Sequence, residues 1–288
     1  MNYDRLLEGK VAAITSGAHG MGYYVSRYLA RHGAVCIING RDPHGEDSAK
    51  ELRKLSPDSF FIQCDMSQKD DVDNFIDKAN AFAGHVDVVA NVVGINTLES
   101  WDKITDDKFE YNQQVNLYGV IRIARGFIPG MIKAGGGSFV HISTIHSVAA
   151  LHNFTAYASS KSAINAFSGA IAAEYGQYGI RSNVICPGGI YSRDLEIKYN
   201  NEIKDDPEKL KEWIGSVHHD IGHPDFGNGS SKDIANACLY YLSDMSRHVT
   251  GTVAMCDGGA YFQSHYFKER RMPPDIDQLF AEFKMNRF

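Results

Sequence analysis

The chain has 288 residues, 43% of them hydrophobic and 22% charged, an ordinary globular composition that can bury a large core within a single domain spanning 1–288. Its 29 Lys and Arg against 35 Asp and Glu give a net charge of -6 with no basic stripe, which argues against a nucleic-acid partner. Residues 1–8 lack the apolar core of a signal peptide and no apolar run is long enough to cross a bilayer, so we expect a cytoplasmic protein without membrane contact.

Short β-branched runs alternate with longer stretches of helical periodicity along the chain. Stretches such as Tyr23–His32, Val72–Phe82 and Ala156–Tyr178 are long enough to form right-handed crossovers between parallel strands. The alternation predicts an α/β fold of the Rossmann type, a doubly wound, seven-stranded parallel sheet with helices on both faces. The seven predicted strands are Val11–Thr15, Val35–Asn39, Phe60–Gln63, Val86–Val92, Phe139–Ser143, Ser182–Ile185 and Val253–Met255.

Two segments interrupt this alternation. Residues 192–228 are charged and irregular and follow the sixth predicted strand, where α/β proteins commonly carry a lid. Residues 260–288 form a C-terminal extension, whose aromatic residues are Tyr261, Phe262, Tyr266, Phe267, Phe280, Phe283 and Phe288. Because so many aromatic side chains are rarely left in water, we expect the extension to be ordered and to pack near a pocket, with a frayed terminus as the alternative.

A glycine-rich loop follows the first predicted strand and precedes a helix, with the sequence T-S-G-A-H-G-M-G over 15–22. Glycines at such a point let the backbone turn sharply and approach a pyrophosphate, whose charge is stabilised at the helix N-terminus. A similar loop also occurs where it only packs a helix against a strand. The residues predicted to hold a dinucleotide here are Ser16, Gly17, His19, Gly20, Met21 and Gly22.

Polar residues end the third and fourth predicted strands, over which a bound dinucleotide would lie. Asp65 is placed to accept a hydrogen bond from an adenine amino group, with Met66 beside it. Asn91 and Gly94 end the next strand. A helix cap at Asp65 and an ordinary turn over 91–94 are the structural alternatives, and the position of both segments in the fold favours cofactor binding.

Tyr157 and Lys161 are four residues apart in a predicted helix, a spacing that puts both side chains on one face. A free tyrosine has a pKa of about 10, and a neighbouring positive charge favours its phenolate, so the lysine makes the tyrosine a usable acid or base. Thr144 ends the fifth predicted strand, where its hydroxyl can bond a substrate oxygen and stabilise developing charge. These three residues are the candidates for interconverting an alcohol and a ketone.

With these motifs the chain resembles the short-chain dehydrogenase/reductase family, in its single-domain branch, from Lys10 to Gly259. The resemblance implies that Asn116 holds a proton-relay water. It implies that Lys161, besides its place in the catalytic set, binds the nicotinamide ribose. The family also associates as homotetramers or dimers, and its loop flanking the nicotinamide corresponds to Pro187, Gly188, Ile190 and Ser192.

Two positions depart from the family pattern. Ser16 stands where the family has its first glycine, which predicts a slightly shifted cofactor geometry. Thr144 stands where the family usually has serine, and Ser143 is its direct neighbour. Either hydroxyl could serve, and the ungapped spacing to Tyr157 favours Thr144.

A narrower similarity relates the N-terminal stretch and the aromatic extension to gut-bacterial hydroxysteroid dehydrogenases, in particular the 20β type. It implies an oxidoreductase that acts on a hydroxysteroid or a similar bulky alicyclic alcohol or ketone. Side chains that could line its pocket, or could equally serve core or subunit packing, are Tyr191, Leu195, Tyr199, Trp213 and the aromatic residues of the extension.

Two other functions remain as alternatives. A sugar-acid or acyl-carrier ketoreductase of the same family would use the same scaffold, because fold and catalytic set do not fix the substrate. A nucleotide-sensing regulator would keep the fold without the chemistry. Such a regulator would be expected to lose one of Asn116, Tyr157 or Lys161, and all three are present.

The choice between NAD(H) and NADP(H) depends on residues that follow the second predicted strand. Arg41 suits the 2′-phosphate of NADP(H), whereas Asp42 suits the free ribose hydroxyl of NAD(H). His19 is not the extra basic residue often found in NADP-specific loops of the family, and the hydroxysteroid dehydrogenases that the chain resembles use NADH. We therefore expect NAD(H), with NADP(H) as the alternative.

No metal is expected. His218, His219 and His223 lie close together with Asp220, but the neighbouring glycine and the loop setting argue against a metal site, and the family chemistry needs none. The five cysteines are widely spaced and odd in number, so we expect reduced and mostly buried thiols.

Overall fold

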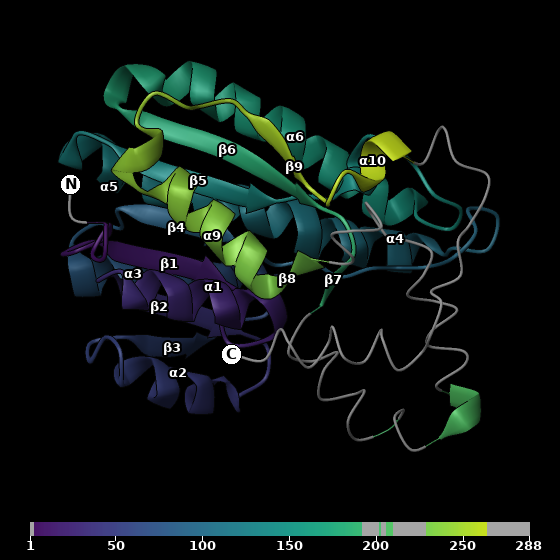
Figure 1. Cartoon of the computed structure of the whole chain (residues 1–288), viewed down its shortest axis with the longest axis horizontal. Coiled ribbons are helices and arrows are strands. Elements are labelled where there is room, and N and C mark those ends of the chain that lie inside the picture. Colours follow the sequence, from purple (N-terminus) through teal and green to yellow (C-terminus); the bar gives the residue numbers. More distant parts are fainter. Residues whose placement is uncertain (1–2, 192–201, 203–205, 210–228, 264–288) are drawn as a thin grey trace.

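Seven parallel strands form the central sheet in the computed structural model, which describes residues 3–191, 202, 206–209 and 229–263 (Figure 1). The strand order is β3-β2-β1-β4-β5-β6-β9, so the chain extends the sheet to one side of β1 first and then to the other. This is the doubly wound Rossmann-type arrangement that the sequence predicts. The strands are β1 Val11–Thr15, β2 Val35–Gly40, β3 Phe60–Gln63, β4 Val88–Asn91, β5 Gly137–Ile142, β6 Ile180–Pro187 and β9 Val253–Cys256.

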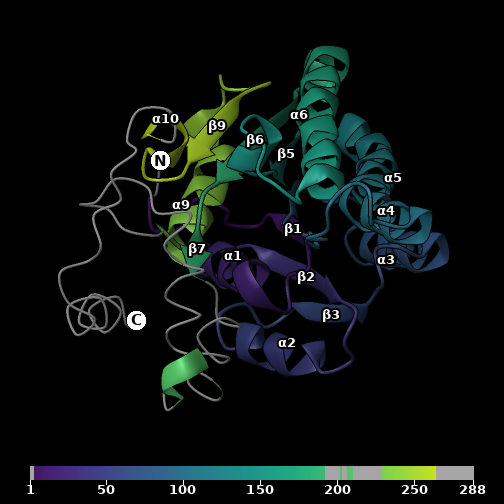
Figure 2. The ribbon, with the colours of Figure 1, turned by 90° about the vertical axis from the view of Figure 1, so that its right-hand side faces the viewer.

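Helices cover both faces of this sheet (Figure 2). One face packs against α1, α2 and α9 through a core that includes Val25 and Ile234, and the other against α3, α5 and α6 through one that includes Phe75 and Phe127. The α-helices are α1 Gly20–Arg31, α2 Gly45–Arg53, α3 Lys69–Ala83, α4 Asp106–Gln113, α5 Gly119–Ala134, α6 Thr155–Tyr175, α9 Ser231–Leu242 and α10 Ala260–Gln263. A π-helical turn, η1 (Gln114–Tyr118), joins α4 to α5, and 3-10 turns are η2 Ile145–Ser147, η3 Gly176–Tyr178 and η6 Asp244–Ser246.

The ends of the strands differ from the predicted ones by up to two residues, and two further details differ from the sequence prediction. Helix α6 ends at Tyr175, before the predicted Tyr178, because the chain tightens into η3 and then turns at Gly179 with φ +75°. A second, two-stranded parallel sheet pairs β7 (Ile190–Tyr191) with β8 (Gly229–Ser230) and was not predicted. Two-residue strands have too few positions for an alternating pattern to be visible.

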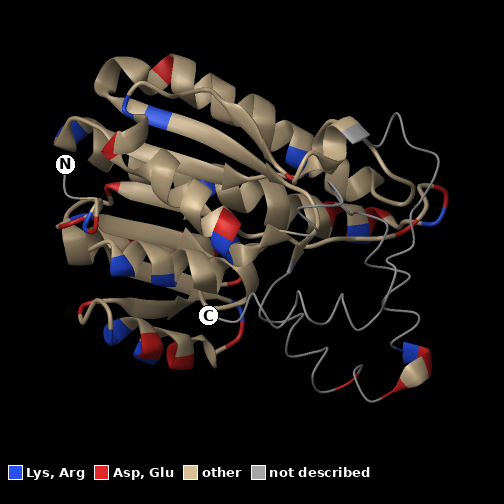
Figure 3. Cartoon of the chain, viewed as in Figure 1, with Lys and Arg blue, Asp and Glu red and all other residues tan. Residues whose placement is uncertain are grey.

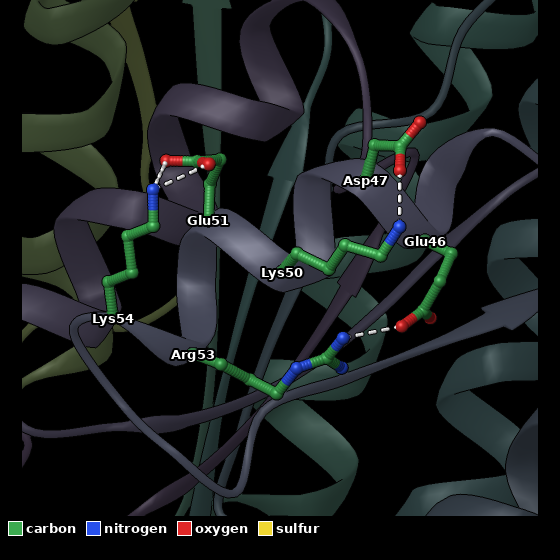
Figure 4. A network of polar contacts seen from close by, with 6 residues as sticks. All are labelled: Glu46, Asp47, Lys50, Glu51, Arg53 and Lys54. Atoms are coloured by element: carbon green, nitrogen blue, oxygen red, sulfur yellow. Dashed lines mark hydrogen bonds and ion pairs between the residues drawn. The ribbon is translucent and has the colours of Figure 1, made fainter.

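Charged residues of both signs are scattered over the described elements, and both signs lie together on α2 (Figure 3). Helix α2 has three ion pairs in a row (Figure 4). They join Lys50 to Asp47, Arg53 to Glu46 and Lys54 to Glu51. Such solvent-exposed pairs contribute at most about 1 kcal/mol each to stability. We therefore assign these ion pairs to solubility and to support of the helix, and we do not assign them to a binding or catalytic site.

Several predicted features lie outside the described residues. They include most of the lid over 192–228, where only 202 and 206–209 are described, and residues 264–288 of the extension. The site residue Ser192, the pocket candidates Leu195, Tyr199 and Trp213, and the histidines His218, His219 and His223 are also outside. These features stay predictions. Within the described ranges no helix is long and apolar enough to cross a membrane, and no group of three metal-binding side chains comes together. All five cysteines are free, and four of them are buried.

Candidate active site

All seven strands are parallel, so the loops that follow them meet at the carboxyl edge of the sheet (Figure 1). The described site residues come from these loops and from the helices beside them. In the sheet register Thr15 is opposite Asn91, and Asn91 is opposite His141. The loop after β1, the segment after β4 and the segment between β5 and α6 are therefore neighbours. This edge is where open α/β sheets bind their ligands.

The glycine-rich loop keeps its turn although a serine replaces the first glycine. Ser16 has φ +54°, the left-handed region that glycine prefers, and its N–H donates a 2.8 Å hydrogen bond to Oδ1 of the buried Asn39. A Cβ on Gly17 would lie 2.8 Å from Oγ of Ser26, and one on Gly22 would lie 2.1 Å from the carbonyl oxygen of Ser16. These two glycines therefore allow the loop to pack closely against strand and helix.

The N-terminus of α1 can accept an anion. Helix α1 begins at Gly20, has no acidic residue in its first turn, and receives no capping hydrogen bond from the His19 side chain. Its first N–H groups and its dipole therefore face the loop without a competing negative charge, as a pyrophosphate requires.

Two buried polar atoms at this edge have no hydrogen-bond partner among the described residues, Nε2 of His19 and Oδ1 of Asn91. Buried polar groups are normally paired, so each can serve a bound polar molecule. A Cβ on Gly94 would lie 3.1 Å from Nζ of Lys161, which shows how closely the backbone after β4 approaches the lysine. The residues present thus fit a dinucleotide.

The adenosine end of the predicted site has mixed support. Oδ1 of Asp65 accepts hydrogen bonds of 2.9 Å and 2.8 Å from the N–H and hydroxyl of Ser67, which fix a turn before α3, whereas the cap position of that helix is Gln68. That leaves the other carboxylate oxygen of Asp65 for an adenine amino group. Met66 is buried and packs under Gly119, where a Cβ would lie 2.7 Å from the Met66 carbonyl oxygen.

The two residues predicted to read the ribose both have partners within the protein. Oδ1 of Asp42 accepts a 2.9 Å hydrogen bond from the N–H of His44. Nη1 of Arg41 donates a 3.0 Å hydrogen bond to the phenol oxygen of Tyr111 on α4. Sequence reasoning did not include Tyr111, because nothing in the sequence brings α4 to the end of β2.

Thr144, Tyr157 and Lys161 come together between β5 and α6. The Thr144 hydroxyl lies beside the phenol of Tyr157, where it lowers the pKa of that phenol, and it accepts a 3.2 Å bond from the N–H of His146. Nζ of the fully buried Lys161 donates to the carbonyl oxygens of Val93 at 3.0 Å and Ile142 at 2.8 Å. An ammonium has three N–H donors, so one remains for a further partner.

The pKa values in this cluster differ from what the sequence suggested. Burial raises the pKa of Tyr157 to about 12, although its hydrogen bond with Thr144 opposes the rise. Burial lowers the pKa of Lys161 to about 8. The expectation that the lysine favours the phenolate is therefore not met in this state, because Nζ is directed to two main-chain carbonyls and desolvation dominates at the phenol.

Asn116 lies at the centre of η1 and joins it to the segment after β4. Its Nδ2 donates to the carbonyl of Ile95 at 2.9 Å and to Oγ of Ser160 at 3.1 Å, and its Oδ1 accepts from the N–H of Ile95 at 2.8 Å. A π-helical turn widens the backbone, a feature frequent at functional sites. The side chain thus positions the segment after β4 against α6.

A buried polar chain beneath the site was missed by sequence reasoning. Nδ2 of Asn91 donates to Nδ1 of His141 at 3.2 Å, so the ring proton lies on Nε2, which donates to Oγ of Ser182 at 3.2 Å. Ser182 and Ser168 share a 2.8 Å hydroxyl bond. Burial, with the charge of Lys161, lowers the pKa of His141 to about 3, which keeps the ring neutral. The one sequence signal was a histidine within an apolar strand.

The segment after β6 closes the far side of the edge. A Cβ on Gly188 would lie 3.0 Å from Cβ of Asp257, so only glycine fits there without movement. Ile190 packs against the buried core from β7, directly after Pro187 and Gly188. Asp257 caps the following turn by accepting from the N–H of Tyr261 at 2.7 Å.

A dinucleotide-type sheet edge beside a hydroxyl, a phenol and an ammonium defines a nicotinamide-dependent oxidoreductase. Comparison with known proteins agrees. A family model described as enoyl-(acyl carrier protein) reductase matches residues 16–261. The 7alpha-hydroxysteroid dehydrogenase of Clostridium sardiniense is 32% identical over 258 residues, which cover 88% of this chain and 94% of that protein.

Two further relatives are named for other activities. The 3-oxoacyl-acyl-carrier-protein reductase of Chlamydia muridarum is 31% identical over 256 residues, 88% of this chain and 98% of that protein. The crystal structure of L-sorbose reductase from Gluconobacter frateurii, complexed with NADPH and L-sorbose, aligns with a TM-score of 0.82 at 26% identity, covering 90% of this chain and 98% of that one. The chain belongs to the short-chain dehydrogenase/reductase family and is an NAD(P)-dependent oxidoreductase.

Proposed function

We propose that this enzyme interconverts a secondary alcohol and a ketone with Tyr157 as the proton-transferring group. The placement of the Thr144 hydroxyl beside the Tyr157 phenol carries the proposal, because it brings two O–H groups to one point where a substrate oxygen can meet both. With its pKa raised to about 12, the phenol is protonated near neutral pH and can donate to a ketone oxygen.

Each remaining residue then has a defined task. A bound nicotinamide would supply or accept the hydride. The Thr144 hydroxyl stabilises the negative charge that develops on the substrate oxygen. Lys161 uses the N–H left over from its bonds to Val93 and Ile142 to hold the ribose, and Asn116 fixes the segment after β4 and, by the family resemblance, holds a relay water.

We propose NAD(H) as the cofactor and NADP(H) as the alternative. Asp42 stands next to Arg41 at the end of β2 and can accept a hydrogen bond from a free ribose hydroxyl. The Arg41 guanidinium keeps its bond to Tyr111 when NAD(H) binds, so the cation is not left unpaired. The alternative is favoured by the structural relative that was crystallised with NADPH.

The proposed substrate is a hydroxysteroid or a similar bulky alicyclic compound, with the 20β position as the site suggested by the sequence. Leu98 and Trp101 after β4 and Val148 and Leu151 between Thr144 and Tyr157 are large apolar side chains that are 45–62% exposed. The two segments are joined by a 3.1 Å bond from the N–H of Glu99 to the carbonyl of Asn153. Apolar surface beside the catalytic hydroxyls suits such a substrate.

Two other enzyme functions have specific support. The fold similarity to L-sorbose reductase favours a sugar-type substrate, and the sequence similarity to a 3-oxoacyl-acyl-carrier-protein reductase favours a carrier-bound one. The nucleotide-sensing regulator is disfavoured because Asn116, Tyr157 and Lys161 are all present and lie close together. The Ser160 hydroxyl bonds both Asn116 and the Tyr157 carbonyl, and Asn116 and Lys161 both lie beside Gly94.

The deciding experiment combines a panel of steroid, sugar-acid and acyl ketones and alcohols, monitored at the reduced-nicotinamide absorbance, with the variant Tyr157→Phe. We expect the variant to lose most turnover and to bind dinucleotide nearly as the wild type does, because it removes the O–H and little volume. Turnover within a few-fold of the wild type would contradict the assignment.

We further propose a single domain with residues 192–228 as its lid, a homotetramer or dimer built on the helices that contain Asn116 and Tyr157, and a cytoplasmic location. Exposed aromatic side chains on the first of these helical segments, Tyr111 and Tyr118, support a role in association. The free state of all five cysteines is in keeping with a reducing compartment.

A further inference from the structure

The contact between Arg41 and Tyr111 spans the sheet edge. Arg41 follows β2, and its main-chain carbonyl is held by a 3.0 Å bond from Nε2 of Gln63 at the end of β3. Its guanidinium reaches Tyr111, 70 residues later in α4, which follows β4. Since β1 lies between β2 and β4 in the sheet, the side chains reach toward each other across the part of the edge where the adenosine half of a dinucleotide would lie.

The partner of Arg41 is neutral and replaceable. The phenol of Tyr111 offers one oxygen to one of five guanidinium N–H donors. A ribose 2′-phosphate would offer charged oxygens in a bidentate geometry, which makes a stronger bond. The bond directs the guanidinium toward α4. We therefore expect a 2′-phosphate to draw Arg41 away from the phenol in order to gain bidentate geometry, whereas NAD(H) leaves the Arg41 to Tyr111 bond intact.

We infer that Tyr111 is a specificity-determining residue that shifts the cofactor preference toward NAD(H) by competing with the 2′-phosphate for Arg41. The inference rests on the proposed dinucleotide site. It assigns a function to a side chain that touches neither the catalytic cluster nor the glycine-rich loop in any described contact. It also explains how an arginine suited to a phosphate can be present in an enzyme that uses NAD(H).

The test is the variant Tyr111→Phe, which removes the competing oxygen and keeps the ring. A hydrogen bond between an exposed guanidinium and a neutral phenol is worth about two- to tenfold in an equilibrium constant, so the Kd for NADPH should fall by about that factor. The Kd for NADH should stay within about twofold, because that cofactor does not disturb the pair. Tyr178→Phe, at an exposed tyrosine in η3, is the matched control and should change neither value.

Binding is measured without turnover, by calorimetric titration of the enzyme with NADPH and NADH and then with adenosine 2′,5′-bisphosphate and adenosine 5′-monophosphate. The bisphosphate should follow NADPH and the monophosphate should follow NADH. In an Arg41→Ala background the effect of Tyr111→Phe should disappear, because the two residues act through one bond.

Three outcomes would overturn the inference. An unchanged NADPH affinity in Tyr111→Phe would remove the competition, and a weakened one would mean that the phenol supports the phosphate site. If Tyr111→Phe still changed NADPH affinity in the Arg41→Ala background, Tyr111 would not act through Arg41. Failure of the folded wild type to bind either dinucleotide is a different result, since it would contradict the proposed function itself.

Discussion

The hydroxyl of Ser143 donates a 3.0 Å hydrogen bond to the main-chain carbonyl of Lys161 and thereby ties the end of β5 to α6. Its neighbour Thr144 presents its hydroxyl to Tyr157 instead. The two adjacent hydroxyls therefore point to different partners, although the sequence allowed either to be the catalytic one.

This difference predicts opposite effects for two alanine variants. Thr144→Ala should lower kcat by about 100-fold or more, the usual cost of removing a donor to a developing oxyanion. Ser143→Ala should lower the free energy of unfolding by about 1 kcal/mol and change kcat little, since it removes a buried structural bond. Steady-state kinetics and urea unfolding of both variants, with Thr144→Ser as an active control, check the assignment. A larger loss of kcat in Ser143→Ala would move the catalytic role to that residue.

The parts of the site that depend on one segment could be predicted from the sequence. The spacing of Tyr157 and Lys161 fixes their common helix face, and strand periodicity together with parallel topology places the ends of β1, β4 and β5 at one edge. These features need only local periods and a general rule of chain connection.

The parts that depend on register between segments could not be predicted. His141 meets Asn91 and Ser182 because β4, β5 and β6 align at one register, which no single strand sequence encodes. The direction of the pKa shift of Tyr157 was missed for a similar reason. The rise comes first from burial of the phenol, while Nζ of Lys161 is held by the carbonyls of Val93 and Ile142, and these surroundings belong to other segments.

The backbone of Ser16 gives a stability prediction. Ser16 is in the left-handed conformation, which costs a residue with a Cβ about 1 to 2 kcal/mol. Glycine avoids this cost, but part of the gain is lost because an unfolded chain with glycine has more conformational freedom. Ser16→Gly should therefore raise the free energy of unfolding by up to about 1 kcal/mol, whereas the β-branched Ser16→Val should lower it. Urea unfolding of both variants at one pH measures the difference. A less stable glycine variant would mean that the serine side chain compensates for the conformation.

The C-terminal extension is tested by deletion. Removing residues 264–288 leaves α10 and its cap at Asp257 intact. If the extension joins subunits or closes a pocket, light scattering should report a smaller assembly or the Michaelis constant for a steroid ketone should rise. An unchanged assembly with unchanged kinetics would leave the extension without either role.

Lys161 links activity to stability through its burial. Its pKa is about 8 in the folded protein against an ordinary value of 10.5, so between these two pH values the unfolded chain binds a proton at this site that the native protein does not. The free energy of unfolding of the wild type should therefore rise with pH in this window relative to Lys161→Met, by up to about 1.4 kcal/mol per pH unit and about 3 kcal/mol in total. Below pH 8 the difference should be constant, because both states are then protonated.

The measurement is urea unfolding of wild type and Lys161→Met at pH 7, 8, 9 and 10. The difference between the two free energies of unfolding cancels the titration of the groups that both proteins share. Lys133→Met, at an exposed lysine in the last turn of α5, is the control and should keep the wild-type slope. The same Lys161→Met protein should have lost turnover and should bind dinucleotide more weakly, because the N–H that we assign to the ribose is gone. A difference between wild type and Lys161→Met that stays flat from pH 7 to 10 would show that the lysine is not desolvated as its two carbonyl partners and its burial require.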